Sequence, residues 1–536
     1  MNPRSFGRYW RCGVMISLLQ SFVSPFVLAQ QASEMPSNTL LDNPKLSSII
    51  VAKVGPWDVT AQEFLLSYEY GPAFPKRESD SKKHYLNYMI YEKLLALDGY
   101  ERKLQSTHMV KEVLSDVEGD LATEELYKDD VLSAVHISDM DIERGVSGEN
   151  VHLGIQWLYS PDKEEIFHQA ALLRNGASFD SLFALQLVDS IKPDDRSMQT
   201  TRFKLEMKNQ ALAAATDSLT AGMTTLPIHT PDGWYLVKIV EEWKNPIITE
   251  TENNKLHEDV RRALLQHRSD SLSDEYVHRM LLAQNPAIDR ESFEVVQAFL
   301  GKKFLSPEKY SAWGLEKKLA GRGLNPDSLA TNRSKVLVTM NDGSFLLGDF
   351  FDWENTRDPY ISLDTKSPRA YFASVEQLVW RMVRDRMLTQ EAYRRGLQHK
   401  ESVLKQTKWW EEKLVYRAAR LEIDNSINRD DSTLHKYYHE HEKDYRDGKG
   451  NLRPFEEVKD DVGRDAFAYQ ETSALLHKIL RLKQKYGVKI NDETLKKLYV
   501  DVENYPKAID VYTVKKGGIF PHTAFPSIDY EWQAWD

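Results

Sequence analysis

The stretch that decides the fold opens with Val151-His152-Leu153-Gly154-Ile155-Gln156-Trp157-Leu158-Tyr159. Its apolar and aromatic residues predict a strand. Residues 162–174 predict a helix that ends at Asn175-Gly176, a pair typical of helix C-termini. The stretch closes with a short strand, a Pro231-Asp232-Gly233 turn and a last strand up to Trp243. A strand, helices and two further strands in this order predict a compact α+β unit.

Three motifs in residues 151–246 stand at the spacing of one known family. They are Asn175-Gly176-Ala177-Ser178-Phe179, then Gly-x-x-Thr-x-Pro-Ile from Gly222 to Ile228, and Thr-x-x-Gly-Trp-x-Leu-Val-Lys from Thr230 to Lys238. Together they resemble the parvulin family of peptidyl-prolyl isomerases. The resemblance implies a parvulin-like domain at residues 151–246 that binds proline-containing peptides and needs no cofactor and no metal. A different small α+β domain with a hairpin end is the alternative.

The resemblance also implies the residues of the site. In parvulins two histidines face each other, one on the first strand and one on the last, and these positions fall here on Gln156 and Tyr235. The remaining candidate substrate-binding residues are Phe203, Leu212, Thr230 and Ser190. Gln156 and Tyr235 can still exchange a hydrogen bond. Because both histidine positions are substituted, we expect peptide binding with weak or absent isomerase activity. The alternative is that both are ordinary side chains of the sheet with no ligand.

Residues 1–29 have the pattern of a secretory signal peptide. Arg4, Arg8 and Arg11 precede an apolar run that ends at Ala29, a plausible cleavage site. We therefore expect a periplasmic protein, with an uncleaved membrane anchor as the alternative. The single cysteine, Cys12, lies in this segment, so the mature chain would form no disulfide and no cysteine metal site.

The composition limits the class of protein and its partners. The 536 residues leave room for two to four domains, and 41% hydrophobic with 28% charged residues describe a globular chain. The net charge of −11 gives no support for nucleic-acid binding. Small-molecule cofactors are not expected either.

Helical patterns flank the parvulin-like stretch on both sides. Residues 48–150 predict a short strand followed by helices, and residues 247–300 are again helical. Helical segments around a parvulin unit in an exported chain resemble the SurA/PpiC type of periplasmic folding factor. The resemblance implies one helical chaperone module, in which residues 247–300 return to pack on residues 48–150.

The second half of the chain repeats the first. Residues 54–64 match residues 340–350 at an offset of 286, and residues 100–105 match residues 393–398 at an offset of 293. The closing residues Val260, Ile288 and Phe293 match Val462, Ile490 and Leu495 at an offset of 202. The smaller last offset means that the second copy lacks about 90 residues, the size of the parvulin-like stretch. We therefore expect a second helical module at 301–500 without an insert, and a tail at 501–536 that either docks or stays free.

His435 and His439 lie one helical turn apart with Glu442 nearby, a spacing that can bind zinc. The sequence offers no clear third ligand, so a solvated helix face is the favoured interpretation and no metal site is predicted.

The whole sequence supports three hypotheses. The leading one is a periplasmic chaperone that binds unfolded exported polypeptides, with outer-membrane proteins among the candidate clients. The second is an active parvulin-type isomerase, and the third is a non-catalytic scaffold of an envelope assembly. The predicted fold class is α+β, with two mainly helical SurA-like chaperone modules and an inserted parvulin-like domain.

Overall fold

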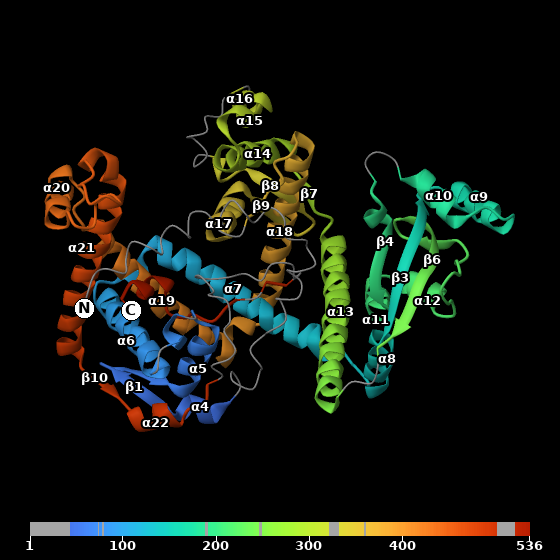
Figure 1. Ribbon diagram of the computed structural model, residues 1–536. Helices are drawn as coiled ribbons and strands as arrows, with labels where there is room; N and C mark the ends of the chain where they lie inside the picture. Colours follow the sequence, from blue (N-terminus) through green and yellow to red (C-terminus); the bar gives the residue numbers. More distant parts are fainter. Residues whose placement is uncertain are drawn as a thin grey trace. The chain divides into compact units, whose positions relative to one another are not determined.

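The computed structural model describes residues 43–72, 74–77, 80–187, 191–245, 249–320, 332–357, 361–500, 520–521 and 523–535 (Figure 1). Contacts divide the chain into two compact units, unit 1 (Met1–Asp129 with Glu275–Asp536) and unit 2 (Asp130–Asp274). Helices and strands both build the fold, which agrees with the expected α+β class. The signal-like segment 1–29 lies outside the described residues, and the domain boundaries drawn from the sequence stay a prediction.

Unit 1 contains the same series of elements twice. The first series is β1 (Ile50–Val54), β2 (Trp57–Thr60), α5 (Ala61–Tyr70), α6 (Ser81–Glu101) and α7 (His108–Asp130), and α4 (Pro44–Ser48) precedes it. The second series is β8 (Val336–Met340), β9 (Gly343–Leu346), α17 (Leu347–Arg357), α18 (Pro368–Arg394) and α19 (Glu401–Asn425). Short 3₁₀ helices, η5 (Leu104–Ser106) and η10 (Leu397–His399), separate the two long helices of each series.

The two series agree residue by residue at the offsets found in the sequence. In the hairpins, Ala52 pairs with Val59 and Val338 pairs with Phe345, both at the offset of 286. At the ends of α6 and α18, Lys103 and Gly396 have positive φ values of 63° and 74°, at the offset of 293. A left-handed residue ends a helix in both copies, although Gly adopts this conformation more easily than Lys.

The closing strands are exchanged between the two series. The first series is followed by α13 (Glu250–Gln284), β7 (Ala287–Ile288), α14 (Arg290–Phe304), α15 (Pro307–Ala312) and α16 (Leu315–Ala320). The second is followed by α20 (Asp431–Glu440), α21 (Phe455–Tyr486), β10 (Val488–Ile490) and α22 (Asp492–Lys497). Strand β10 pairs antiparallel with β1, and β7 pairs antiparallel with β8. In Figure 1, β10 in red therefore lies beside β1 in blue.

This exchange differs from the expectation that the closing segment of the first copy returns to its own helices. Val295 and Val296 of α14 pack instead in one core with Phe345 and Phe350 of the second series. Each hairpin obtains its third strand from the other copy, and a two-stranded hairpin is marginally stable alone. The two copies therefore form one interlocked unit.

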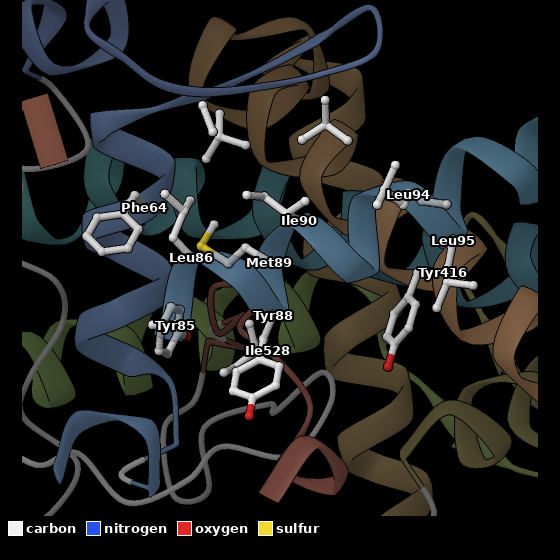
Figure 2. Packing of buried hydrophobic residues seen from close by; sticks show 14 of the residues in the cluster. Phe64, Tyr85, Leu86, Tyr88, Met89, Ile90, Leu94, Leu95, Tyr416 and Ile528 are labelled. Carbon is white, nitrogen blue, oxygen red and sulfur yellow. The ribbon is translucent and has the colours of Figure 1, made fainter. Parts of the chain in front are cut away.

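The core of the first series centres on α6 (Figure 2). Leu86, Ile90 and Leu94 lie in this cluster, and so do Tyr85, Met89 and Leu95 from other sides of the helix, so α6 is buried on more than one face. Tyr416 of α19 and Ile528 of the C-terminal segment pack in the same cluster. Helix α6 is thus covered by residues from the second half of the chain.

Buried charges join the long helices. Arg357 at the end of α17 lies 2.8 Å from Asp116 and 3.0 Å from Asp120, both on α7. Arg386 of α18 binds Asp116 as well, at 2.9 Å. The side chain of Arg357 is 6% exposed. Charges at this depth are tolerated because each has a partner of opposite sign.

Unit 2 is built on one antiparallel sheet with the strand order β4-β3-β6-β5. Its elements are α8 (Asp139–Glu149), β3 (Val151–Ser160), α9 (Lys163–Arg174), α10 (Phe179–Gln186), β4 (Ser197–Thr201), α11 (Arg202–Lys208), α12 (Gln210–Thr216), β5 (Ile228–Thr230) and β6 (Gly233–Lys244). The expected strand, helices and closing hairpin are present, and β4 is an additional strand. The amide of Asn245 donates to the carbonyl of Asn150 at 3.2 Å, so the two ends of the stretch 151–244 lie together.

The C-terminal residues 523–535 dock onto unit 1, one of the two outcomes left open for the tail. Trp532 is fully buried, and η11 (Tyr530–Trp535) contains it. Among the residues that the structure describes, none of the helices combines the length and hydropathy of a membrane span.

The buried charge cluster predicts a large and specific loss of stability. Replacing Arg357 with Leu leaves Asp116 and Asp120 without their main partner, so the free energy of unfolding should fall by about 3–5 kcal/mol. Urea unfolding followed by circular dichroism measures this change. In the control Arg394→Leu, whose side chain is 70% exposed, the loss should stay below about 1 kcal/mol. Equal effects of the two substitutions would contradict the structural role of Arg357.

Candidate functional site

The sheet of unit 2 has two differently covered faces. Leu158 and Leu236 lie opposite each other on β3 and β6 and pack against Ile166 of α9 and Phe183 of α10. The other face carries the second apolar cluster, which includes Leu205 of α11 and is flanked by Leu212 of α12. Because side chains alternate along a strand, each residue of β3 and β6 belongs to one face or the other.

Gln156 and Tyr235 lie on opposite faces and do not form the expected pair. Gln156 pairs with Lys238, whose ammonium group binds Asp180 of α10 at 2.8 Å. Tyr235 pairs with Tyr159 instead. Tyr159 lies three residues after Gln156 on β3, and side chains an odd number of residues apart on a strand point to opposite faces. Gln156 therefore points away from Tyr235. The hydrogen bond predicted between them is therefore excluded by the strand register.

Tyr159 and Tyr235 form the cross-strand pair of this face, with ring centroids 5.1 Å apart. The backbone amide and carbonyl of Tyr159 bond to the side chain of Gln186 at 3.0 and 3.1 Å, and so point away from β6. Tyr159 and Tyr235 are thus a non-hydrogen-bonded pair, and in antiparallel sheets such pairs bring their side chains closest together. Two phenol rings thus occupy the place where the sequence suggested a glutamine and a tyrosine.

Asp232 in the hairpin turn holds both phenols. Its carboxylate accepts hydrogen bonds from Tyr235 and from Thr230, and its carbonyl accepts one from Tyr159 at 2.6 Å. The bonds from Thr230 and Tyr235 lower the pKa of Asp232, while burial and the nearby Asp232 carboxylate raise the pKa of Tyr235. Asp232 is therefore ionised and Tyr235 protonated at neutral pH, and the carboxylate accepts hydrogen bonds from the hydroxyl groups of Tyr235 and Thr230.

The surroundings of the tyrosine pair are apolar on one side and basic on the other. Trp157, Met198 and Leu212 are partly buried against the cluster below Tyr235. The guanidinium group of Arg196 lies 5.0 Å from the ring centre of Tyr159. Apolar rings, two hydroxyl groups and a guanidinium group are thus gathered on one part of this face.

The other predicted site residues are only partly in this place. Leu212 is partly buried against the apolar cluster, and its role in substrate binding stays a prediction. The hydroxyl group of Thr230 is engaged by the hairpin turn, where it donates to Asp232 and to the carbonyl of Gly233. Phe203 packs in a separate core with Val146 of α8 and Val260 of α13. Ser190 lies outside the described residues.

Phe203 differs from the prediction because α8 and α13 cover α11. A Cβ atom added at Gly145 would come within 3.1 Å of the Phe203 ring, which shows how closely α8 approaches it. The side chain is 5% exposed and serves as a packing residue between helices. Motif spacing alone gives no sign of this contact, because β5 and β6 separate α11 from α13 in the sequence.

The residues that the sequence missed are Tyr159, Asp232 and Arg196. Strict alternation from Trp157 to Tyr159 could have placed Tyr159 on the same face as Trp157. The Thr-Pro-Asp-Gly turn could have indicated Asp232 as an acceptor for nearby hydroxyl groups. Arg196 has no local signal, since its position depends on the connection that leads into β4.

The described residues contain no group of three or more His, Cys, Asp or Glu side chains that could hold a metal ion. His439 bonds to Glu442 at 3.1 Å, while the ring of His435 stacks on Phe455 with centroids 3.7 Å apart. One imidazole is thus engaged in a hydrogen bond and the other in packing.

Comparison with known proteins gives matches among solved structures. No protein-family model and no curated protein matches the chain. The chain is similar to structures of the foldase PrsA. The peptidylprolyl isomerase PrsA of Bacillus anthracis is 17% identical, with 36% of this chain and 96% of that chain covered and a TM-score of 0.22. The foldase protein PrsA of Streptococcus pneumoniae is 14% identical, with 37% and 84% covered and a TM-score of 0.21. The peptidylprolyl isomerase PrsA of Bacillus cereus is 15% identical, with 43% and 92% covered and a TM-score of 0.22. At these identities and TM-scores, the similarity does not assign an activity to the chain.

The register of β3 and β6 predicts where two engineered histidines can meet. In Tyr159→His with Tyr235→His, the imidazoles share one face at directly opposed positions and should bind Zn²⁺. Zinc at about 100 times its Kd should then stabilise the protein by about 2.7 kcal/mol, seen as a rise in Tm.

The matched control is Gln156→His with Tyr235→His, which also adds two histidines but places them on opposite faces. It should show no more zinc stabilisation than the unmodified chain. If the control gains as much as the 159/235 variant, the register described here is wrong.

Proposed function

We propose that this chain is an exported folding factor that holds unfolded polypeptides, and that its unit 2 binds proline-containing segments with weak or absent isomerase activity. The observation that carries the second half of the proposal is the aromatic face of Trp157, Tyr159 and Tyr235 on the antiparallel sheet. It lies in the stretch whose three motifs resemble parvulins. Binding a twisted proline amide better than a planar one is sufficient to lower the barrier of about 18–20 kcal/mol, and requires no cofactor.

The hydrogen-bonding state of the site supports weak rather than efficient catalysis. The hydroxyl groups of Tyr159 and Tyr235 already donate to Asp232, so they must give up these bonds to reach a peptide amide. Among the described residues of the sheet, His152 stacks on Trp243, and the ring of His229 lies tilted beside Trp234. By the alternation along β3 and β5, both histidines lie on the face opposite to Tyr235, so neither is beside it.

The surface of unit 1 supports the holding of unfolded chains. Tyr469, Leu476 and Leu480 lie along one face of α21 and are 45–56% exposed, and Leu421 of α19 is 46% exposed. Exposed apolar side chains of this kind mark interaction surfaces. Covering them with an apolar segment contributes about 25 cal/mol per Å² of buried area.

The N-terminal sequence supports the proposed location. The signal-like pattern of residues 1–29 supports export to the periplasm, where unfolded exported polypeptides, including outer-membrane proteins, would be the clients. We keep residues 151–246 as the peptide-binding domain. We propose that residues 48–150 with 247–300 form one sequence copy of the helical part and that residues 301–500 form the other. In the structure the two copies exchange their closing strands. An active isomerase and a non-catalytic scaffold remain the two alternatives.

The first prediction of this proposal concerns catalysis. The purified protein should isomerise model proline peptides far more slowly than a parvulin that carries both histidines, because Tyr159 and Tyr235 replace the polar pair and are held by Asp232. A protease-coupled proline-peptide assay measures the rate. A rate equal to that of the parvulin would favour the active isomerase.

The second prediction separates holding from unit 2. A variant in which Val151–Trp243 is replaced by a short Gly/Ser linker should fold, because Asn150 and Asn245 already lie within hydrogen-bonding distance. It should still suppress the aggregation of an unfolded client, measured by light scattering. Removal of Phe203 uncovers Val146 and Val260, so circular dichroism and gel filtration should accompany the assay.

The control addresses the apolar face of α21. Because the two copies are interlocked, deleting one of them would leave hairpins without their third strand and could not serve this purpose. Leu476→Glu with Leu480→Glu changes exposed positions only, and it should weaken client holding while helical content stays the same. If the linker variant is folded but inactive and the glutamate variant is fully active, unit 2 is the working part. If neither the intact chain nor any variant holds a client, the scaffold hypothesis is favoured.

A further inference from the structure

The C-terminal segment is held in unit 1 by a defined set of polar contacts. The indole Nε1 of Trp532 donates to Glu92 Oε1 of α6 at 2.9 Å, and the backbone amide of Asp529 donates to the same oxygen at 2.8 Å. The carboxylate of Asp529 lies 2.9 Å from the ammonium group of Lys413 and also binds Arg417, both on α19. Two side chains spaced as Asp-x-x-Trp are therefore recognised together.

Aromatic packing completes the recognition. The Trp532 ring stacks on Tyr88 and Tyr416, with interplanar angles of 22° in both cases, and Arg420 lies 5.3 Å from its centre. Further along the segment, the carbonyl of Ala524 accepts a hydrogen bond from Trp410 Nε1 at 2.9 Å. We call this set of residues on α6 and α19 the Trp532 site.

In the second copy, the position that corresponds to the Trp532 indole is occupied by a tryptophan of that copy, Trp353. Asp385 of α18 matches Glu92 at the offset of 293, and it accepts a hydrogen bond at 3.0 Å from the indole of Trp353 on α17. Trp353 matches Ser67 of α5 at the offset of 286. The first copy thus has a small side chain where the second has tryptophan, and its buried carboxylate obtains an indole from a distant segment instead.

The two copies also differ in the arginine that lies over the tryptophan ring. Arg357 lies 5.2 Å from the centre of the Trp353 ring and matches Gly71 at the offset of 286. In the first copy this role falls to Arg420 of α19. Tyr85 of α6 fills the space at Ser67 and Gly71, and the indole that reaches Glu92 comes from the separate C-terminal segment.

The occupant leaves space beside it. A cavity of about 50 Å³ adjoins the segment Phe525–Ile528 and is lined on the other side by Glu63, Lys93 and Trp409. A ligand with a larger side chain beside these contacts has room to extend into this space.

We propose that the Trp532 site is a peptide-binding site for segments that form one helical turn and carry an acidic residue three positions before a tryptophan, and that the chain's own tail, with Trp532 in η11, is its resident occupant. Such a segment in another polypeptide exchanges with the tail. The identity of this partner as an unfolded polypeptide rests on the proposed function, whereas the site itself is tested without a client. Lys413 and Arg417 select the acidic residue, and Glu92 selects the indole N–H over a phenyl ring.

Tethering explains why the tail occupies the site in the intact chain. A segment joined to its site by a linker has an effective concentration in the millimolar range. A free peptide with the same contacts must compete with this concentration, so it binds the intact chain weakly. Cutting the linker removes the advantage of the tail.

The experiment uses the full chain with a protease site, flanked by Gly and Ser, inserted at position 510. The protein folds with its tail in place and is then cut. A fluorescent peptide of residues 520–536 should bind the cut protein, measured by anisotropy, at least tenfold more tightly than the uncut protein. Peptides with Asp529→Asn or Trp532→Ala should each bind the cut protein at least tenfold more weakly.

The outcomes separate exchange from a fixed structural role. If the cut protein stays folded by circular dichroism but retains its tail against excess peptide for hours, the segment is a permanent part of the core and the proposal is wrong. Equal binding of the native and substituted peptides would overturn it as well. Aggregation assays with the uncut chain test the proposed holding function separately. Failure of peptide exchange at the Trp532 site would therefore leave the holding function standing, and the reverse is also true.

Discussion

The exchange of closing strands is the constraint on which unit 1 depends. Strand β10 belongs in sequence to the second copy and completes the sheet of the first, while β7 does the reverse. Neither hairpin has three strands without the other copy, and two-stranded hairpins are marginal in water. The long helices follow from this arrangement, because α6 must lie against α19 and α7 against α18. Tyr100 and Tyr393 mark the two contacts, since they bond to Glu411 and Glu118 at positions related by the same offset of 293.

Buried charges then fix how these helices meet. In the second copy, Arg357 neutralises two aspartates of α7, and Asp385 receives the indole of Trp353. In the first copy, Glu92 pairs with Lys413 at 2.7 Å and receives the indole of Trp532. Burial raises the pKa of Glu92, although Lys413 opposes this shift. A carboxylate at this depth needs several donors, and the first copy obtains two of them from the tail because α5 carries Ser67 and Gly71 where α17 carries Trp353 and Arg357.

The sequence predicted local features well and the choice of partners poorly. The offsets between the copies follow from turn residues and helix ends, which depend on neighbouring residues, so the hairpins and helix ends agree with them. Which hairpin Ile288 or Ile490 joins is a different question, because both pairings form equivalent backbone hydrogen bonds and have similar apolar residues. Gln156 illustrates the same limit on a smaller scale. A motif places a residue along a strand, but an error of one position moves its side chain to the other face of the sheet.

The geometry of unit 2 explains how its site could diverge without cost to unit 1. The ends of the stretch 151–244 meet at Asn150 and Asn245, so changes on the sheet do not alter the path of α8 and α13. Phe203 is the exception, since it packs against both helices and must stay apolar and large. Tyr159, Asp232 and Tyr235 differ from Phe203, because their contacts lie within the sheet, its turn and its connections. A change at Tyr159, Asp232 or Tyr235 would therefore alter the chemistry of this face of the sheet while leaving the helical part intact.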